Sequence, residues 1–285
     1  MKLLLLGSTG LVGQAMAQEA RSRGWILVAA ARSGAGRQLD ISDDVRLEGT
    51  LAEESPDLVV NCAALVDIQR CEADPGLAYR TNARPLALLA DWSRRTGGAL
   101  LHISTDHFYT EGTDRAHPES DPVSLINDYA RSKYAGEGFA LVAPGALVLR
   151  TSIVGIRGWE WPTFAEWAID AVLNDRNVTL FADAYTSSID VRTFSKAALD
   201  LQASGARGLL NLAAAEVYSK EHFVREVARQ LGRELTTAAS GTVASLTPPR
   251  PSSLGLDVTG AQRYLGYALP LLPSVVASVI DQYRE

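Results

Sequence analysis

Tyr129 and Lys133, a tyrosine and a lysine four residues apart, are the pair in this 285-residue sequence best suited to chemistry. On a helix, residues at this spacing lie on one face, one turn apart. The lysine ammonium would then favour the phenolate form of a tyrosine, whose pKa in water is about 10. Such a tyrosine can protonate a ketone as it is reduced. The alternative is a partly buried tyrosine beside a solvated lysine, a chance pairing among nine tyrosines.

The bulk composition excludes several classes of protein. With 47% hydrophobic and 21% charged residues, the chain is ordinary for one large α/β unit or two joined domains. A formal charge of −6 argues against a general nucleic-acid binder, which carries a basic surface. The two cysteines, Cys62 and Cys71, indicate neither a disulfide framework nor a metal cluster. No apolar run approaches the roughly 18 residues of a membrane span, so we expect no membrane partner. Together with the low cysteine count, this predicts a reduced, cytoplasmic protein.

The N-terminus contains a candidate cofactor site. The apolar run from Leu3 to Leu6 predicts a buried parallel strand, which leads into a glycine loop and a helix from Leu11 to Arg23. The glycines allow a tight turn and a close approach of the backbone. The free N–H groups at the start of the helix can bind a diphosphate. The spacing, Gly-x-x-Gly-x-x-Gly, leaves a plain strand-to-helix turn as the alternative.

The second predicted strand, Trp25 to Ala31, ends at Arg32. An acidic residue here would bind the ribose hydroxyls of NAD, whereas an arginine can pair with the 2′-phosphate of NADP. We therefore favour NADPH, with NADH and an ordinary surface arginine as the alternative. Asp40, beyond this strand, is expected near the adenine.

Two further predicted strands end in small or polar residues. The strand from Leu58 to Ala64 finishes with small side chains, which would let the backbone press against a cofactor. The strand from Leu100 to Ile103 runs straight into Ser104-Thr105-Asp106. Open α/β folds place chemistry at the carboxyl ends of parallel strands, although a helix cap or a turn is the alternative here.

The remaining pattern is less regular. Three of the five tryptophans gather between residues 155 and 167, where they suit a core or a subunit interface, or a stack on a substrate ring. A long loop, residues 108–126, precedes the helix that carries Tyr129. The other helices that the pattern predicts span residues 43–54, 75–96, 191–203, 220–231, 260–265 and 273–283.

In their order along the chain, the glycine loop, the strand-end Ser-Thr-Asp and the Tyr-x-x-x-Lys pair resemble the extended short-chain dehydrogenase/reductase family. Within it, the sequence is most similar to the dTDP-4-dehydrorhamnose reductases. The further motifs that carry the resemblance span nearly the whole chain: Asn61-Cys62-Ala63-Ala64, Cys71-Glu72, Asn82, Lys133-Tyr134-Ala135-Gly136-Glu137, Arg150-Thr151-Ser152, Arg250-Pro251 and Leu256-Asp257.

The resemblance implies an α/β fold, with a Rossmann-type, doubly wound parallel sheet and a smaller C-terminal α/β substrate-binding domain. We expect residues 1–152 to form the NAD(P)-binding domain, with residues 189–212 returning to it. Residues 153–188 and 213–285 would form the substrate-binding domain. A homodimer is one assembly that such a chain can adopt.

The resemblance also implies roles for individual residues. Tyr129 would donate the proton, Lys133 would lower its pKa and hold the nicotinamide ribose, and Thr105 would hydrogen-bond the substrate carbonyl. Besides Tyr129 and Lys133, the residues assigned to the cofactor are Gly7, Thr9, Gly10, Leu11, Val12, Gly13, Arg32, Asp40, Ile41, Cys62, Ala63, Ala64 and Ser104. Together with Thr105, those assigned to the substrate are Asp106, His107, Ser152, Trp159 and Arg250. No metal ligand is assigned.

The sequence departs from the family pattern on the substrate side. Relatives usually have Ser-Thr-Asp-Tyr-Val-Phe, whereas His107-Phe108-Tyr109 follows Asp106 here. An aspartate of the family is Gln69, and a Gly-x-Pro-Thr-like loop is replaced by residues 185–188, Tyr-Thr-Ser-Ser. The pattern Arg-Pro-x-Asn-Ser becomes Arg-Pro-Ser-Ser at residues 250–253. The resemblance therefore implies an intact cofactor chemistry and an altered recognition of the nucleotide sugar.

These features together predict an NADPH-dependent ketoreductase that acts on a 4-keto-6-deoxy nucleotide sugar or a related carbohydrate. One alternative is an NAD-dependent nucleotide-sugar epimerase or dehydratase, which an acidic residue in place of Arg32 would favour. The other is a non-catalytic NADP-binding regulatory subunit, which the loss of Tyr129 or Lys133 would favour.

Overall fold

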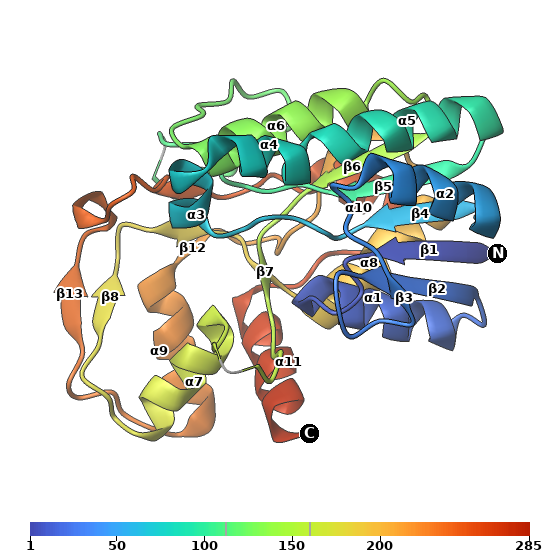
Figure 1. Ribbon diagram of the computed structural model, residues 1–285. Coiled ribbons are helices and arrows are strands. Elements are labelled where there is room, and N and C mark those ends of the chain that lie inside the picture. Colours follow the sequence, from blue (N-terminus) through green and yellow to red (C-terminus); the bar gives the residue numbers. More distant parts are fainter. Residues whose placement is uncertain (112, 160) are drawn as a thin grey trace. The chain divides into compact units, whose positions relative to one another are not determined.

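A computed structural model describes residues 1–111, 113–159 and 161–285 of the chain (Figure 1). The chain divides into two compact units. Unit 1 consists of Met1–Thr105, Asn127–Arg150 and Ser195–Leu210. Unit 2 consists of Asp106–Ile126, Thr151–Phe194 and Asn211–Glu285. The expected division placed residues 1–152 and 189–212 in one domain. Here residues 106–126 and 151–152 belong to unit 2, and the return to unit 1 runs from Ser195 to Leu210.

Unit 1 is built on a seven-stranded sheet with the order β11-β6-β5-β4-β1-β2-β3. Its strands are β1 (Lys2–Leu6), β2 (Ile26–Ala31), β3 (Arg37–Gln38), β4 (Leu58–Asn61), β5 (Ala99–Ile103), β6 (Ala146–Arg150) and β11 (Gly208–Asn211). The pairs from β3 to β6 are all parallel. The strand order reverses between β1 and β4, which is the switch point where such sheets bind ligands. The prediction of a doubly wound Rossmann-type sheet is confirmed.

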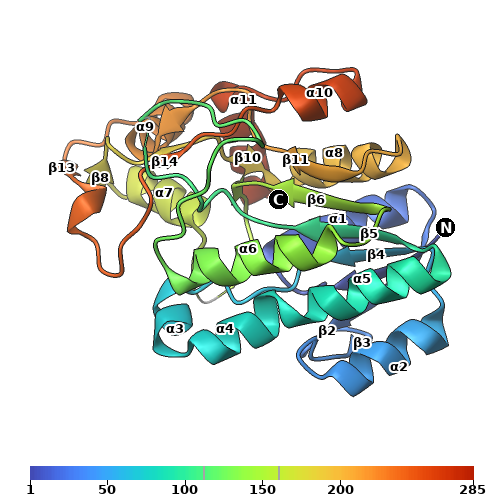
Figure 2. The same cartoon turned by 90° about the horizontal axis from the view of Figure 1, so that it is seen from above.

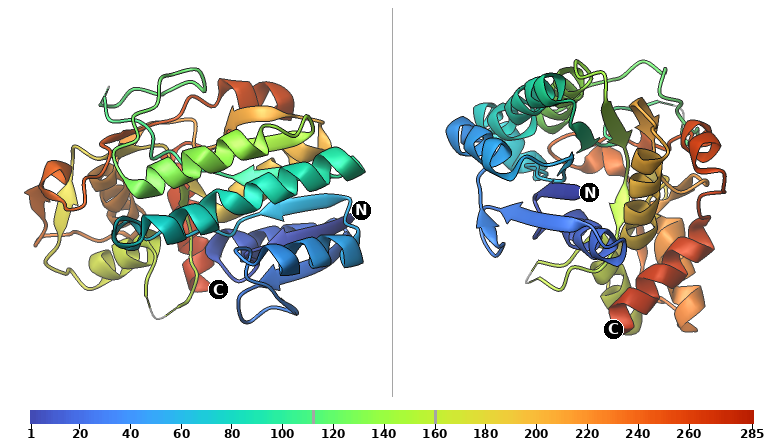
Figure 3. Two further views of the ribbon diagram at one scale, coloured as in Figure 1. Left: turned by 45° about the horizontal axis from the view of Figure 1, so that its top comes forward. Right: turned by 90° about the vertical axis from the view of Figure 1, so that its right-hand side faces the viewer.

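Helices cover both faces of this sheet. On one face lie α1 (Leu11–Ser22) and α8 (Val191–Ala203), the latter belonging to unit 1 from Ser195 onward (Figure 3). On the other face lie α2 (Asp44–Glu54), α4 (Pro75–Asn82), α5 (Arg84–Thr96) and α6 (Asp128–Ala140). The side chains of Leu3 to Leu6 are fully buried, as expected for a central parallel strand with helices on both faces.

The single helix predicted over residues 75–96 is wrong. The structure has two helices that meet at Ala83, because Pro85 lies in the first turn of α5 and lacks the N–H that a continuous helix needs. A short helix, α3 (Ile68–Ala73), was not predicted, although Asp67 caps it by accepting a hydrogen bond from the backbone N–H of Arg70.

Unit 2 is a mixture of short strands and helices (Figure 2). The strands form three small sheets: β7 (Ile153–Val154) with β10 (Ile189–Asp190); β9 (Tyr185–Thr186) with β12 (Tyr218–Ser219) and β14 (Ser253–Leu254); and β8 (Thr179–Phe181) with β13 (Ala239–Gly241). The helices are α7 (Phe164–Leu173), α9 (Lys220–Leu231), α10 (Thr259–Leu265) and α11 (Leu272–Arg284), with a 3₁₀ turn at Val243–Ser245. Apolar faces of α7, α9 and α11 build the core of this unit. None of the helices in the described ranges is long and apolar enough to cross a membrane.

Candidate active site

The glycine loop between β1 and α1 is shaped by close backbone contacts. Gly7 has a φ of 80°, and a Cβ atom on it would lie 2.7 Å from the backbone nitrogen of Ala63. A Cβ atom on Gly13 would lie 2.1 Å from the carbonyl oxygen of Gly7. Glycine is therefore required at both positions, since any larger residue would push the loop away from β4 and α1.

The same loop has the properties of an anion site. Gly10 precedes the first residue of α1, so no side chain caps the helix there, and its first N–H groups are available. The hydroxyl of Ser8 is buried and has no hydrogen-bond partner among the residues that the structure describes. Backbone donors and an unpaired hydroxyl at the switch point of the sheet fit the diphosphate of a dinucleotide. Thr9, Leu11 and Val12 complete this turn.

Arg32 and Asp40 lie beside each other beyond the carboxyl end of β2. Both side chains are exposed. The pKa of the Asp40 carboxylate is lower than usual, because partial burial raises it but the surrounding groups lower it by more. Those groups are the backbone N–H and hydroxyl of Ser42, at 2.9 and 2.8 Å, and the charge of Arg32. Ile41 is buried next to them. An exposed cation next to an ionised carboxylate suits a polar ligand such as an adenosine phosphate.

Residues 62–64 follow β4 and lie against the glycine loop. The backbone N–H of Cys62 donates to the carbonyl of Leu6, and that of Ala63 donates to the side chain of Asn61. Burial raises the pKa of the Cys62 thiol to about 12, so it is neutral at ordinary pH. Together with Ala64, these small side chains form a half-buried floor beside Gly7.

Tyr129 and Lys133 lie one turn apart on α6, as the spacing predicted. The side chain of Asn127 caps the helix by accepting from the N–H of Ala130 at 2.8 Å. The Lys133 side chain is only 2% exposed, and its Nζ atom donates to the carbonyl of Ile103 at 2.6 Å. Burial lowers the pKa of Lys133 to about 8, while Glu137 opposes this shift.

The end of β5 is thereby tied to α6. Ser104 and Thr105 follow Ile103 directly, and both are buried. Ser104 was assigned to the cofactor, yet its hydroxyl donates to the carboxylate of Glu137 at 2.6 Å. Lys133 thus lies against the carboxyl end of β5, directly before Ser104 and Thr105, whereas Tyr129, one turn earlier on α6, packs with Ile68, Cys71 and Ala78.

The residues assigned to the substrate, apart from Thr105, lie in unit 2. Burial, together with the charges of Lys220 and Arg250, lowers the pKa of His107 to about 3. Burial and Arg250 also lower the pKa of Lys220, whereas Asp106 raises it. Asp106, His107, Lys220 and Arg250 therefore act on one another as a cluster with a positive balance.

Ser152 and Trp159 have other neighbours in unit 2. The hydroxyl of Ser152 lies 2.8 Å from that of Ser188. Trp159 is 50% exposed, and the guanidinium of Arg157 lies over its ring at 4.2 Å. An exposed indole beside a cation offers a flat face for a ring.

Sequence reasoning missed two residues of this region. Lys220 is the first residue of α9, 114 positions from Asp106, and no local pattern indicates their proximity. Glu137 stands one helical turn after Lys133, so its spacing was a usable signal that it shares the same face. In the described ranges, no three histidine, cysteine, aspartate or glutamate residues are grouped so that they could hold a metal ion.

The whole chain, residues 1–285, matches the model of a known family, the RmlD substrate binding domain. The protein belongs to the RmlD family. Its sequence is 29% identical over 297 residues to the probable low-salt glycan biosynthesis reductase Agl14 of Haloferax volcanii, across 100% of this chain and 99% of that relative. It is 29% identical over 276 residues to the dTDP-4-dehydrorhamnose reductase of Mycobacterium tuberculosis, across 95% of this chain and 88% of that protein.

The solved structures agree on the fold. The dTDP-4-dehydrorhamnose reductase of Bacillus anthracis, solved in complex with NADP, superposes with a TM-score of 0.88 at 20% identity and covers 99% of each chain. The predicted membership of the extended short-chain dehydrogenase/reductase group is confirmed. Since the named relatives are reductases, this RmlD family member belongs among the oxidoreductases.

Proposed function

We propose that this RmlD family member is an NADPH-dependent ketoreductase acting on a 4-keto-6-deoxy nucleotide sugar or a closely related keto sugar. The observation that carries the proposal is the placement of Lys133. It is a buried ammonium, one turn after Tyr129, and it binds the last carbonyl of β5 immediately before Ser104 and Thr105. This is the arrangement that a reductase needs to deliver a proton beside the end of a strand.

Each of the three residues has a separate task in the proposed reaction. NADPH, when bound, supplies the hydride that adds to the ketone carbon. Tyr129 gives its phenolic proton to the oxygen on which negative charge develops, and the Thr105 hydroxyl donates a hydrogen bond to that oxygen. Lys133 stabilises the phenolate that remains, because an ammonium carries three N–H donors and the Ile103 carbonyl accepts one of them.

The proposed cofactor site uses the residues that surround the switch point of unit 1. The open N-terminus of α1 and the buried Ser8 hydroxyl would hold the diphosphate, with Gly7 and Gly13 allowing the close approach. Arg32 would pair with the 2′-phosphate, which supports NADPH over NADH. A solved relative of the same fold binds NADP. We accordingly assign the cofactor to unit 1 and the sugar to the residues of unit 2.

The cofactor assignment is tested by binding measured through tryptophan fluorescence. NADPH should quench the emission at lower concentration than NADH, and Arg32→Ala should reduce that preference by about tenfold, as expected for one lost phosphate contact. Arg46→Ala is the control, because Arg46 is equally exposed on α2 and pairs with Asp43. Tighter binding of NADH than of NADPH to the unaltered protein would contradict the assignment of NADPH as the cofactor.

The reaction itself is tested by following NADPH oxidation across a panel of 4-keto nucleotide sugars. The first member of the panel is dTDP-4-dehydrorhamnose, because a similar protein is a dTDP-4-dehydrorhamnose reductase. Since His107 and Thr186 depart from the family pattern, the panel also includes other sugars and nucleotides. We expect turnover of at least one. If none is turned over although NADPH binds, the function is regulatory or the substrate is a different carbonyl compound.

A further inference from the structure

Glu137 is a buried carboxylate to which no role has been assigned. It lies on α6, one turn after Lys133, with 2% of its side chain exposed. Arg150, the last residue of β6 and 3% exposed, donates from Nε to Oε1 at 3.0 Å and from Nη2 to Oε2 at 2.8 Å. Ser104 Oγ donates to Oε1 at 2.6 Å. The carboxylate is thus held by two strands while it sits on the helix of Tyr129.

The geometry forms two parallel links between α6 and β5. Lys133 and Glu137, one turn apart on the helix, bind the consecutive residues Ile103 and Ser104. The backbone N–H of Ser104 also donates to the carbonyl of Leu149 on β6, at 2.7 Å. Because Ile103 and Ser104 are bound by α6 and Ser104 also by β6, the end of β5 has little conformational freedom. Thr105, the next residue, is positioned by the same contacts.

Lys133 and Arg150 bring two positive charges to this region, and the Glu137 carboxylate offsets one of them. Lys133 and Arg150 are cations in a region that excludes water, and such groups are costly without a counter-ion. Two other titratable groups that face Lys133 are neutral at ordinary pH: burial raises the pKa of Cys62 on the β4 side and lowers that of His102 on β5 well below its usual range. Tyr129 lies one turn before Lys133 on α6. Glu137 therefore supplies the negative charge for both cations.

We propose that Glu137 is a positioning residue of the reaction, which fixes the end of β5 against α6 and keeps Lys133 an ammonium. This inference rests on the proposed function for its effect on turnover. The effect on Lys133 itself is independent of any substrate, so the two can fail separately.

The direct test is the titration of Lys133 in protein labelled with ¹³C and ¹⁵N at lysine. The chain has four lysines, at positions 2, 133, 196 and 220, so Lys133 is assigned by the resonance missing from Lys133→Met. Glu137→Gln keeps an acceptor for Ser104 but removes the charge. We expect the titration midpoint of Lys133 to fall by about one pH unit or more. The pH at which kcat/KM declines on the alkaline side should fall by the same amount.

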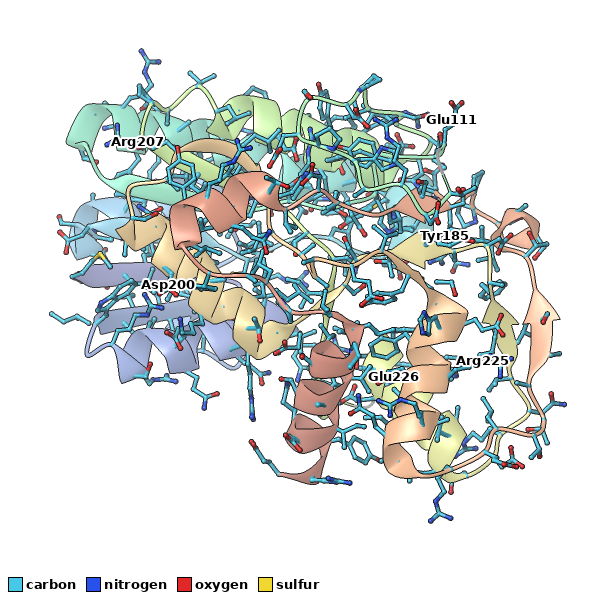
Figure 4. All side chains as sticks on the ribbon, turned by 180° about the vertical axis from the view of Figure 1, so that it is seen from behind. Glu111, Tyr185, Asp200, Arg207, Arg225 and Glu226 are labelled. Atoms are coloured by element: carbon cyan, nitrogen blue, oxygen red, sulfur yellow. The ribbon has the colours of Figure 1, made fainter. Side chains whose placement is uncertain are left out.

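A charge-balancing variant separates this effect from simple damage. Glu137→Gln combined with Arg150→Gln removes one charge of each sign, so the midpoint of Lys133 should return toward that of the unaltered protein. The matched control is Glu226→Gln on α9 (Figure 4), which breaks a pair between a mostly buried glutamate and Arg229. It should leave the Lys133 titration and the pH profile unchanged. A midpoint that stays in place in Glu137→Gln overturns the proposal.

Should Glu137→Gln fail to fold, Ser104→Ala is the variant to test. It keeps the charges of the lysine, glutamate and arginine and removes the hydrogen bond from Ser104 to Glu137. We expect kcat to fall several-fold while the Lys133 midpoint stays where it is; an unchanged kcat overturns the positioning role. If Lys133 shifts as expected in Glu137→Gln but no ketone is reduced by the unaltered protein, the charge role stands and the proposed function fails.

Discussion

Two buried polar networks, one in each unit, are built from different kinds of group. In unit 1, three ionised side chains, Lys133, Glu137 and Arg150, are each at most 3% exposed and contact one another or the end of β5. In unit 2, at the loop that replaces the Gly-x-Pro-Thr-like pattern, the hydroxyls of Thr186 and Ser188 meet that of Ser152. These hydroxyls lie 2.8 to 3.3 Å apart and carry no charge.

A second network in unit 2, in which Asp121 also pairs with Arg115, holds described residues of the long loop that precedes α6. His117 contacts Asp121 through Nδ1 at 2.8 Å and Ser253 Oγ through Nε2 at 2.9 Å. The order of contacts is that of a hydrolase triad, but Ser253 is fully buried and its hydroxyl donates to the carbonyl of Thr113. No nucleophile is therefore presented. The network ties the loop to β14, as does the bond from the His117 N–H to the Gly255 carbonyl.

The difference indicates which parts of the molecule can change. Removing one partner of a buried ion pair typically costs about 3–5 kcal/mol, whereas a neutral hydrogen bond contributes about 1 kcal/mol. The ionic network therefore tolerates few substitutions, and the hydroxyl network tolerates many. This agrees with the sequence, in which the departures from the family pattern, at residues 69, 107, 185–188 and 252–253, leave Lys133, Glu137 and Arg150 unchanged.

The largest effect is expected at the hydroxyl of Tyr129. Tyr129→Phe removes the proposed proton donor and nothing from the ionic network, so kcat should fall by roughly 10²- to 10⁴-fold. NADPH binding, measured by fluorescence, should be kept. Tyr134→Phe, an exposed position on the same helix, is the control and should retain full turnover. Turnover of Tyr129→Phe within a few-fold of the unaltered protein would remove Tyr129 from the mechanism.

The ionic network itself is tested by Arg150→Met. The substitution leaves the Glu137 carboxylate buried without its cation, so the free energy of unfolding in urea should fall by about 3–5 kcal/mol. Arg229→Met removes the cation of the Glu226 pair, and because Arg229 is 67% exposed, water screens this pair and the loss of stability should be much smaller. Equal losses in the two variants would show that the burial of the Glu137–Arg150 pair does not set the cost of losing its cation.

Much of the fold follows from local sequence. The bounds of α8 and α9 agree with the predicted ranges, because their apolar periodicity is strong and Gly232, with a φ of 61°, ends α9. The break between α4 and α5 was missed, since an Arg-Pro step suits the first turn of a new helix as well as a kink in an old one. Helix α7 was missed because its tryptophan-rich approach masks the capping box of Thr163 and Glu166.

The site could be predicted only where it depends on strand ends and helical spacing. Ser104 and Thr105 follow a buried strand, and Lys133 follows Tyr129 by one turn, so local rules find them. That the Ser104 hydroxyl is used by Glu137 depends on how α6 lies over β5, 33 residues away in the chain. Such a contact is set by tertiary packing, and no local period encodes it.

The pH dependence of stability should reveal the free-energy cost of burying Lys133 as an ammonium. Its pKa is about 8 in the folded chain and about 10.4 when unfolded, so between these values only the unfolded chain holds the proton. Stability relative to Lys133→Met should therefore rise with pH across this window, by up to roughly 3 kcal/mol. Urea unfolding of both proteins from pH 7 to 10 measures the difference. A difference that does not change with pH would show that Lys133 is not destabilised as an ammonium.

The smallest effect is expected in the hydroxyl network of unit 2. Ser188→Ala removes one of three hydroxyls, and since Ser152 and Thr186 still lie within reach of each other, unfolding should become easier by only about 1 kcal/mol. Ser204→Ala, at an exposed helix end, is the control and should cost less. Because Ser152 is assigned to the substrate, KM should rise a few-fold in Ser188→Ala while kcat stays within twofold. A fall in kcat as large as that of Tyr129→Phe would show instead that these hydroxyls take part in the chemistry, and the separation of chemistry in unit 1 from recognition in unit 2 would be lost.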